Sequence, residues 1–289
     1  MAPDKYSAVW ISHTSLNDYL RCPRAYYLKH IYKDPHTRHK IKLITPPLSL
    51  GSAVHEVIES YSVLPLKERF FGSMIEKYNI IWEKVSGKKG GFLTDESERT
   101  YKSRGADMIR RVMKHPGPLA KMAIKIKKDL PYFWLSEEAG IILCGKIDWL
   151  EYLSETDSVH IIDFKTSKYD ESDNSLQLPI YYLLATECQT RPVTKASYWY
   201  IGRSDDLSEK KLPDLATSRQ KILDIGNRIK TARKLEVFSC PNGAGGCREC
   251  APYERLLKGE GEFVGLDQYK TDLYILPSVA DDSMESEML

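Results

Sequence analysis

The sequence lacks several features that would assign it to a particular class of protein. It contains no apolar run of about eighteen residues, and its opening stretch "MAPDKYSAVW" has no hydrophobic signal core. We therefore expect a protein without a membrane segment that works in the cytoplasm, or in the host-cell cytoplasm if its source is a virus. The formal net charge is only +2, so any surface for nucleic acid must be a local one.

Cysteine is also scarce, with six residues in the chain. In a reducing cytoplasm such residues are more often thiols or metal ligands than disulfides. Cys144 and Cys188 lie in apolar contexts and are expected in the core. The glycines of "SGKKGGF" (86–92) are not followed by Gly-Lys-Ser/Thr, which excludes a P-loop for nucleotide phosphates.

The order of the predicted elements indicates an α/β fold with a mixed central sheet flanked by helices. Helical periodicity, with Ser15 and Asp18 as a rough capping box for the first helix, predicts helices over residues 15–33, 49–61, 66–85, 95–114, 174–188 and 213–234. Strand-like segments follow from about residue 122, at 122–130, 140–153, 158–167 and 195–202.

We expect one domain over residues 1–280 and a disordered acidic tail at 281–289. Within the domain the predicted parts are a helical subregion at 50–120, an α/β core at 121–235, and a metal-cluster region formed by Cys22 together with 238–256.

The stretch "VHIIDFKTSK" (159–168) is a buried strand that ends in two charges. Side chains two apart on a strand project to one face, so Asp163 and Lys165 converge there while Phe164 packs the other way. Taken alone, this is most simply a solvated ion pair that contributes about 0–1 kcal/mol. Asp148 in the apolar run "LCGKIDWLEYL" changes the interpretation, because an isolated buried carboxylate is unfavourable unless it is paired or binds metal.

Two acids on adjacent strands, Asp148 and Asp163, therefore predict a bound divalent ion, and oxygen ligands favour Mg²⁺ or Mn²⁺. At these positions the chain resembles the PD-(D/E)xK nuclease superfamily, and within it the RecB-like and CRISPR-adaptation-type iron–sulfur nucleases. Asp148 matches the first acidic position of that family, and Asp163-Phe164-Lys165 matches the (D/E)-x-K position.

Three further motifs occur in the order that the family shows, so that the resemblance covers residues 12 to about 256. "LGSAVHEVIESY" resembles the Gly-x3-His motif at Gly51 and His55, and "QLPIYYLLA" resembles the Q-x3-Y motif at Gln177 and Tyr181. "YLRCPRAYYLKH" resembles the N-terminal Cys-Pro helix. An ordered set of motifs is far more specific than any one of them.

The resemblance implies phosphodiester hydrolysis on a restriction-endonuclease-like fold. Asp148, Asp163, His55 and the backbone carbonyl of Phe164 would hold the ion, which would polarise the scissile phosphate and activate a water. Lys165 would orient or help deprotonate that water. In-line attack that leaves a 5′-phosphate is the family expectation.

His55 and Gln177 also have simpler interpretations. A lone helical histidine is most often a surface or core-edge residue, and "HEVIE" (55–59) lacks the second histidine of a zinc-protease helix. Gly51 and the downstream acids favour a metal ligand, with Glu59 one turn away as support for it. Gln177 and Tyr181 share one helical face, where they either pack and cap locally or line the active-site wall near DNA.

Three cysteines, Cys240, Cys247 and Cys250, form a C-x6-C-x2-C cluster in a glycine-rich loop. The C-x2-C spacing lets two thiolates bind one metal centre. The resemblance implies that Cys22 joins them around a [4Fe–4S] cluster. The family's usual cysteine after the pair is replaced by Leu256, so Cys240 would substitute for it, and zinc or unligated thiols are the alternatives.

We expect a metal-dependent DNA exonuclease or structure-dependent nuclease that acts on single-stranded or end-containing DNA in repair, recombination or processing. Between residues 21 and 42, seven Lys/Arg residues against one acid are interleaved with Tyr26, Tyr27 and Tyr32, as in a surface for phosphates and stacked bases. The basic stretch "KMAIKIKK" (121–128) is a second candidate wall. No base-reading motif occurs, so we predict little sequence specificity.

Two other functions fit the same residues. The chain could be a DNA-binding or scaffold subunit of a recombination or CRISPR-adaptation complex with a vestigial nuclease site, although intact buried charges argue against a disused site. An RNA-directed nuclease would share the chemistry. A helicase or recombination protein is the expected partner of the enzyme.

Overall fold

The computed structural model describes residues 4–276, so the predicted tail at 281–289 lies outside the described residues. The helices and strands, in chain order, are β1 (Val9–Ile11), α1 (His13–Arg21), α2 (Pro23–Tyr26), β2 (Ile41–Leu43), α3 (Pro46–Ser62), α4 (Met74–Trp82), α5 (Asp95–Lys114), β3 (Tyr132–Ser136), β4 (Ile141–Cys144), β5 (Trp149–Leu153), β6 (Ser158–Lys165), α6 (Gln177–Cys188), β7 (Val193–Tyr200), β8 (Ser208–Lys210), α7 (Leu215–Leu235), α8 (Ala251–Leu257), β9 (Glu262–Leu266) and β10 (Asp272–Ile275).

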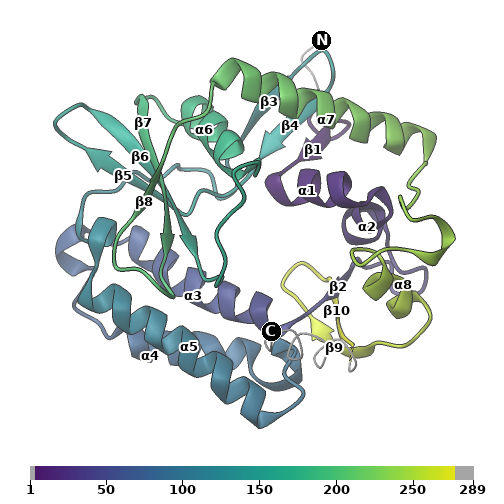
Figure 1. Ribbon diagram of the computed structural model, residues 1–289, viewed down its shortest axis with the longest axis horizontal. Helices are drawn as coiled ribbons and strands as arrows, with labels where there is room; N and C mark the ends of the chain where they lie inside the picture. The colour runs from purple at the N-terminus through teal and green to yellow at the C-terminus, as the bar shows by residue number, and fades with distance from the viewer. Residues whose placement is uncertain (1–3, 277–289) are drawn as a thin grey trace.

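A mixed four-stranded sheet in the order β5-β6-β7-β8 carries the residues of interest (Figure 1). β5 and β6 are antiparallel, β6 and β7 are parallel, and β7 and β8 are antiparallel. β6 is buried from Ser158 to Phe164, and its side chains alternate between two apolar cores. This alternation sends Phe164 to one face of the sheet and Asp163 and Lys165 to the other.

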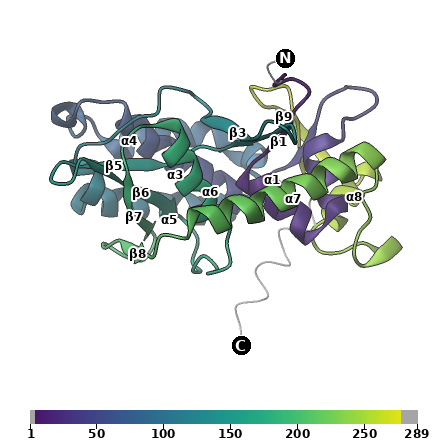
Figure 2. The ribbon, with the colours of Figure 1, turned by 90° about the horizontal axis from the view of Figure 1, so that it is seen from above.

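Helices cover both faces of this sheet, which confirms the predicted α/β class. On one face α3, α4 and α5 pack against Trp149, Phe164 and Trp199. On the other face α6 and α7 pack against Ile161 and Tyr198, and the long helix α7 lies beside α1 and α6 (Figure 2). The two cores fix the sheet between helical layers, so the charged ends of β5 and β6 are held in place.

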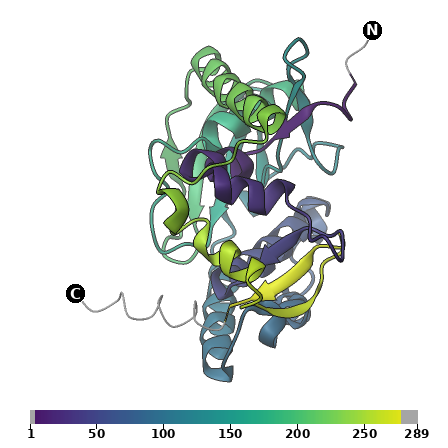
Figure 3. The same cartoon turned by 90° about the vertical axis from the view of Figure 1, so that its right-hand side faces the viewer.

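Two smaller sheets join distant parts of the chain. β1 pairs in parallel with β4, which pairs antiparallel with β3. β10 pairs in parallel with β2 and antiparallel with β9, so the C-terminal hairpin lies beside residues 41–43 (Figure 3). This second sheet places the C-terminal segments next to the N-terminal helices α1 and α2.

Two predicted strands differ from the structure. Residues 122–130 were expected to form a strand but make only a single bridge, Ala123 to Glu151, because the segment meets the edge of β5 briefly and then turns away. The strand expected at 140–153 is two strands in different sheets, since the chain leaves β4 at Gly145, whose N–H donates to the Pro131 carbonyl at 3.1 Å. The sequence prediction missed β3, directly after the segment at 122–130, and also the short strands β1, β2, β8, β9 and β10.

The first helices also begin and end at other residues than expected. α1 starts at His13 with Ser12 and Ser15 as its capping box, so the box predicted for Ser15 and Asp18 is wrong. Asp18 instead accepts hydrogen bonds from the Lys29 and His30 side chains, each at 2.8 Å. The helix predicted over 66–85 is regular only in α4, because Pro65 and Gly72 favour turns before it.

Gly105 tests how closely α5 packs on its neighbours. A Cβ at this position would overlap the buried Tyr78 hydroxyl and lie 2.9 Å from Leu50 Cδ1. Gly→Ala inside a helix normally stabilises by about 0.5–1 kcal/mol. Here we expect Gly105→Ala to lower the free energy of unfolding by about 1–3 kcal/mol, because the core is overpacked. Urea denaturation measures this, with the exposed Ser103→Ala as control; an unchanged or higher stability for Gly105→Ala would contradict the packing.

Candidate active site and cysteine cluster

Asp148 and Asp163 lie side by side where β5 begins and β6 ends. Trp149 pairs with Ile162 in the antiparallel register, so Asp148, one residue before β5, faces Asp163 across the two strands. The two carboxyl groups interact directly, and the Phe164 N–H donates to Asp148 Oδ2 at 2.9 Å. Asp163 is 2% exposed, so this is a pair of acids largely withdrawn from water.

The Lys165 side chain contacts the Asp163 carboxylate on the same face of β6. Its Nζ lies 2.9 Å from Asp163 Oδ2 and 3.1 Å from Glu171 Oε2. The ammonium group also stands over the Tyr198 ring, 4.9 Å from its centroid. Sequence reasoning missed Glu171, which comes from the loop after β6 and belongs to no motif, so no pattern of residues distinguishes it.

Gln177 and Tyr181 complete this network from the first turns of α6. The Gln177 amide nitrogen donates to Asp163 Oδ1 at 2.8 Å and to the Tyr181 hydroxyl at 3.1 Å, while its oxygen accepts from Lys165 Nζ. The Lys165 ammonium can only donate and the Asp163 carboxylate accepts, so these two partners determine the orientation of the amide. The two α6 residues therefore hold the Asp163–Lys165 pair in one arrangement.

His55 and Glu59 approach from the opposite side, on consecutive turns of α3. His55 Nδ1 lies 3.4 Å from Asp148 Oδ2, and its ring contacts the edge of Phe164. Glu59 is paired with Lys146, which lies two residues before Asp148. One ligand atom from each of His55, Glu59 and Asp148 lies within 4.8 Å of the other two.

The pKa values of the ionisable groups in this site are shifted in different directions. Burial and the negative charge of Asp148 raise the pKa of Asp163 above its ordinary value. For Asp148, burial is outweighed by the His55 ring and the Phe164 N–H, which hold the pKa of that carboxyl below its ordinary value. Burial lowers the pKa of His55, but the Asp148 carboxylate overcomes this and raises it to about 8. Two acids this close strongly favour a cation between or beside them.

The donor set fits a divalent ion. Asp163 Oδ2 is buried and receives no hydrogen bond of good geometry, although the Lys165 ammonium lies close by. His55, Glu59 and Asp148 offer carboxylate oxygens and an imidazole nitrogen at one spot, and such ligands suit Mg²⁺ or Mn²⁺. The Asp163 carboxylate faces Asp148 from the adjacent strand. Glu59, which the sequence suggested only as support for His55, is one of the three residues whose possible ligand atoms gather here.

Comparison with protein-family profiles matches residues 10–255 to the PD-(D/E)XK nuclease superfamily. The chain belongs to this superfamily. Membership indicates a metal-dependent nuclease that acts on DNA, and it accords with the restriction-endonuclease-like arrangement of a mixed sheet between helices. A comparison with curated proteins finds no significant match. In the described part of the nuclease, no helix is long and apolar enough to cross a membrane.

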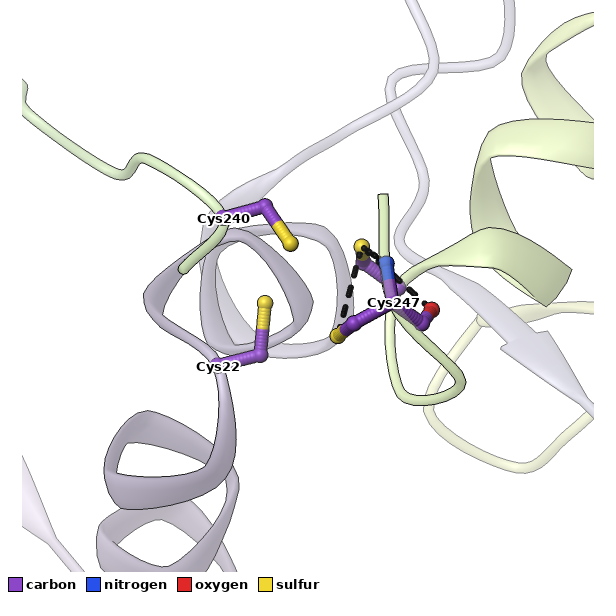
Figure 4. Close-up of side chains that lie close together, drawn as sticks. Cys22, Cys240 and Cys247 are labelled. Carbon is purple, nitrogen blue, oxygen red and sulfur yellow. Dashed lines mark hydrogen bonds between the residues drawn. The ribbon is translucent and has the colours of Figure 1, made fainter. Parts of the chain in front are cut away.

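The nuclease also brings its four predicted cysteine ligands together (Figure 4). Sγ atoms of Cys22, Cys240, Cys247 and Cys250 all lie within 4.8 Å of one another, and those of Cys247 and Cys250 are 3.8 Å apart. Cys22 comes from the junction of α1 and α2, and the other three come from the segment between α7 and α8. Four thiolates at one point suit zinc or an iron–sulfur cluster.

The local backbone explains why these sulfurs converge. Cys22 is extended, with φ −163°, and caps α2 by accepting from the Ala25 N–H through its sulfur at 3.4 Å. Gly246 has φ +71°, a left-handed conformation that lets the loop turn back so that the Cys247 N–H meets Cys250 Sγ at 3.2 Å. Cys144 is buried and Cys188 half-buried, as expected for core residues.

Two hollows lie near these centres, the first lined mainly by basic residues and the second by both basic and acidic ones. One, of about 860 Å³, is lined by Lys33, Lys40 and Arg233 together with the stacked rings of Tyr27 and Phe238, whose centroids are 5.1 Å apart. The other, of about 650 Å³, contains Asp148 and Glu59 and is lined in part by the segment at 124–131. Of the three tyrosines that the sequence suggested for base stacking, Tyr26 is fully buried and only Tyr27 lines the first hollow.

Proposed function

We propose that this superfamily member is a deoxyribonuclease of the RecB-like iron–sulfur branch, and that it acts as an exonuclease on single-stranded or end-containing DNA. One observation carries the proposal: the carboxylates of Asp148 and Asp163 face each other across two strands, and Lys165 contacts Asp163 while His55 contacts Asp148. Action in repair, recombination or processing with a helicase or recombination partner rests on the resemblance alone.

The metal ligands in this proposal are Asp148, His55 and Asp163, with the Phe164 carbonyl or Glu59 as further donors. Support comes from the unsatisfied Asp163 Oδ2 and from the mutual approach of the His55, Glu59 and Asp148 donor atoms. When bound, a divalent ion polarises the scissile phosphate and lowers the pKa of a bound water.

The remaining residues position the substrate and the attacking water. Lys165 is surrounded by the oxygens of Asp163, Glu171 and Gln177, so its ammonium group is held in place. A fixed cation at this point would neutralise phosphate charge and orient the water for in-line attack, leaving a 5′-phosphate. Gln177 would act through Asp163 and Lys165, and Tyr181 through Gln177.

A scaffold protein with a vestigial site is the weaker candidate. A disused site has no physical reason to keep two adjacent buried carboxylates, since replacement of either one would relieve their repulsion. The complete network around Asp163 therefore supports the enzyme.

We expect Asp148→Ala and Lys165→Ala each to lower Mn²⁺-dependent cleavage of a single-stranded oligonucleotide by about 100-fold or more, because each removes an electrostatic element of the site. Titration calorimetry should separate them: Asp148→Ala loses Mn²⁺ affinity, whereas Lys165→Ala retains it. Lys211→Ala, at an exposed position, is the control. Full activity in either active-site variant would show that the assignment is wrong.

The four cysteines form a structural metal centre in this proposal. The order of Cys22 before a C-terminal group of three supports a [4Fe–4S] cluster through the resemblance. The 3.8 Å separation of Cys247 and Cys250 favours a single zinc ion, since sulfurs placed tetrahedrally at 2.3 Å from zinc lie about 3.8 Å apart. In either case the centre links Cys22 to Cys240, 218 positions later in the chain.

Anaerobic purification should yield either a brown protein with iron and sulfide or a colourless one with one zinc per chain. We expect Cys22→Ser and Cys250→Ser to lose the metal and to lower the thermal midpoint, because metal-binding free energy contributes to folding. Cys188→Ser, outside the cluster, is the control and should do neither. Wild-type protein that contains neither iron nor zinc would contradict the proposed centre.

The hollow next to the cysteines is the proposed path of the DNA strand away from the active site. Lys33 and Lys40 lie at its edge and have no acidic partner within 4.0 Å in the described part of the chain. Partial burial and the nearby charges of Arg233 and Lys33 lower the pKa of Lys40, as expected where several cations lie close together. The ring of Phe238 beside Tyr27 adds an aromatic surface for a base.

Replacement of both Lys33 and Lys40 by Ala should weaken single-stranded DNA binding and make it less sensitive to salt. Loss of two phosphate contacts reduces the slope of log affinity against log salt concentration by about 1.4. Fluorescence anisotropy with a labelled oligonucleotide measures both quantities, and Lys211→Ala with Lys221→Ala gives the same change of charge elsewhere. If both double variants gave the same slope of log affinity against log salt concentration, the result would contradict this path for the DNA strand.

A further inference from the structure

The hollow that contains Asp148 is lined in part by a residue from the C-terminal part of the chain. Its lining includes Asp148 and Glu59 from the candidate active site, Lys125 and Lys128 from the segment before β3, and Tyr269 from the loop between β9 and β10. In Figure 1 this yellow loop extends from the C-terminal hairpin toward the middle of the molecule. No motif of the superfamily draws attention to Tyr269.

The loop holds the Tyr269 ring out into solvent on a fixed backbone. Asp267 Oδ1 accepts the N–H groups of Tyr269 at 2.8 Å and of Thr271 at 2.9 Å, and the Asp267 N–H donates to the Thr271 carbonyl at 3.1 Å. Tyr269 nevertheless remains 79% exposed, and its ring stacks on no other ring in the described part of the chain. A large aromatic face that is both exposed and positioned is available to a ligand.

The base of the hairpin is anchored well enough to place that ring. β10 pairs with β2, and the buried Asp272 accepts hydrogen bonds from His39 Nδ1 at 2.8 Å and from the Thr37 hydroxyl at 2.6 Å. Leu276, directly after β10, packs in the same apolar core as Cys22 and Cys250. The cysteine region therefore fixes the position of Tyr269, and Tyr269 lines the hollow that contains Asp148 and Glu59.

The chemistry of this hollow suits one class of ligand. Lys125 and Lys128 are exposed cations that can contact phosphates, and Asp129 lies beside them in the same lining. An aromatic ring binds a nucleobase by stacking on its face, whatever the base is. In a duplex both faces of an internal base are covered by its neighbours, so only an unpaired or terminal base can offer a face.

We propose that Tyr269 stacks on an unpaired base of the strand whose phosphate lies at Asp148, and that this contact makes the nuclease prefer single-stranded DNA. The inference deepens the proposed nuclease function and rests on it for the position of the phosphate. Tyr269 is a residue that positions substrate and takes no part in the chemistry.

The test compares Tyr269→Ala, Tyr269→Leu and Tyr269→Phe with Tyr6→Ala, which removes an equally exposed tyrosine from outside the hollow. Binding is measured by anisotropy with a labelled oligonucleotide in buffer without divalent metal, and cleavage is measured separately in Mn²⁺. We expect the Ala and Leu variants to raise the dissociation constant and the KM for single strands roughly fivefold or more, and Phe to stay within about twofold of wild type. Mn²⁺ affinity should be unchanged in all four variants.

Oligonucleotides with one abasic site give the decisive comparison. At one position near the cleaved bond, removal of the base should weaken binding to wild type but not to Tyr269→Ala, since the lost contact is the same. The inference is overturned if no abasic position behaves in this way, if Tyr269→Ala binds single strands like Tyr6→Ala, or if duplex binding falls equally. Wild-type protein that binds strands through Tyr269 but cleaves none would instead contradict the proposed nuclease function alone.

Discussion

Two carboxylates held side by side and largely out of water, those of Asp148 and Asp163, are the constraint on which this structure depends. Their repulsion opposes folding, so the surrounding elements each supply a compensating group. α3 brings the His55 ring, and the β6 backbone donates the Phe164 N–H. The Lys165 ammonium lies beside Asp163 Oδ2, and Gln177 in the first turn of α6 donates to Asp163 Oδ1. The helical layers on both faces of the sheet hold these groups at fixed separations, which is the requirement of a site built to bind a cation.

The sequence could predict those parts of the site that follow from the regular spacing of side chains along one strand or one helix. Alternation along β6 requires Asp163 and Lys165 to share a face opposite Phe164, and the i, i+4 spacing of Gln177 and Tyr181 requires one helical face. The antiparallel connection of β5 to β6 is short, so Asp148 had to return close to Asp163. These relations are local in the chain, and tertiary packing has little freedom to alter them.

The parts that could not be predicted depend on contacts between distant or irregular segments. Residues 122–130 alternate lysine with apolar residues as a strand does, yet the sheet edge that they meet accepts only one bridge. Glu171 lies in an irregular loop, where no periodicity relates its side chain to Lys165. The spacing of the cysteine sulfurs, and hence the choice between zinc and iron–sulfur, is set by how α1 and the loop before α8 pack, which no C-x2-C pattern specifies.

Two short segments of the chain connect the cysteine region with the candidate active site. α1 ends at Cys22 and begins at His13, whose pKa is lowered by burial and is also affected by the charges of Glu171 and Lys165. The hairpin of β9 and β10 shares an apolar core with Cys22 and places its loop at the hollow of Asp148. A metal centre at the cysteines would therefore order two walls of the site without touching the sheet. The carboxylates would survive the loss of that centre, but the surfaces proposed to guide a DNA strand to them would not.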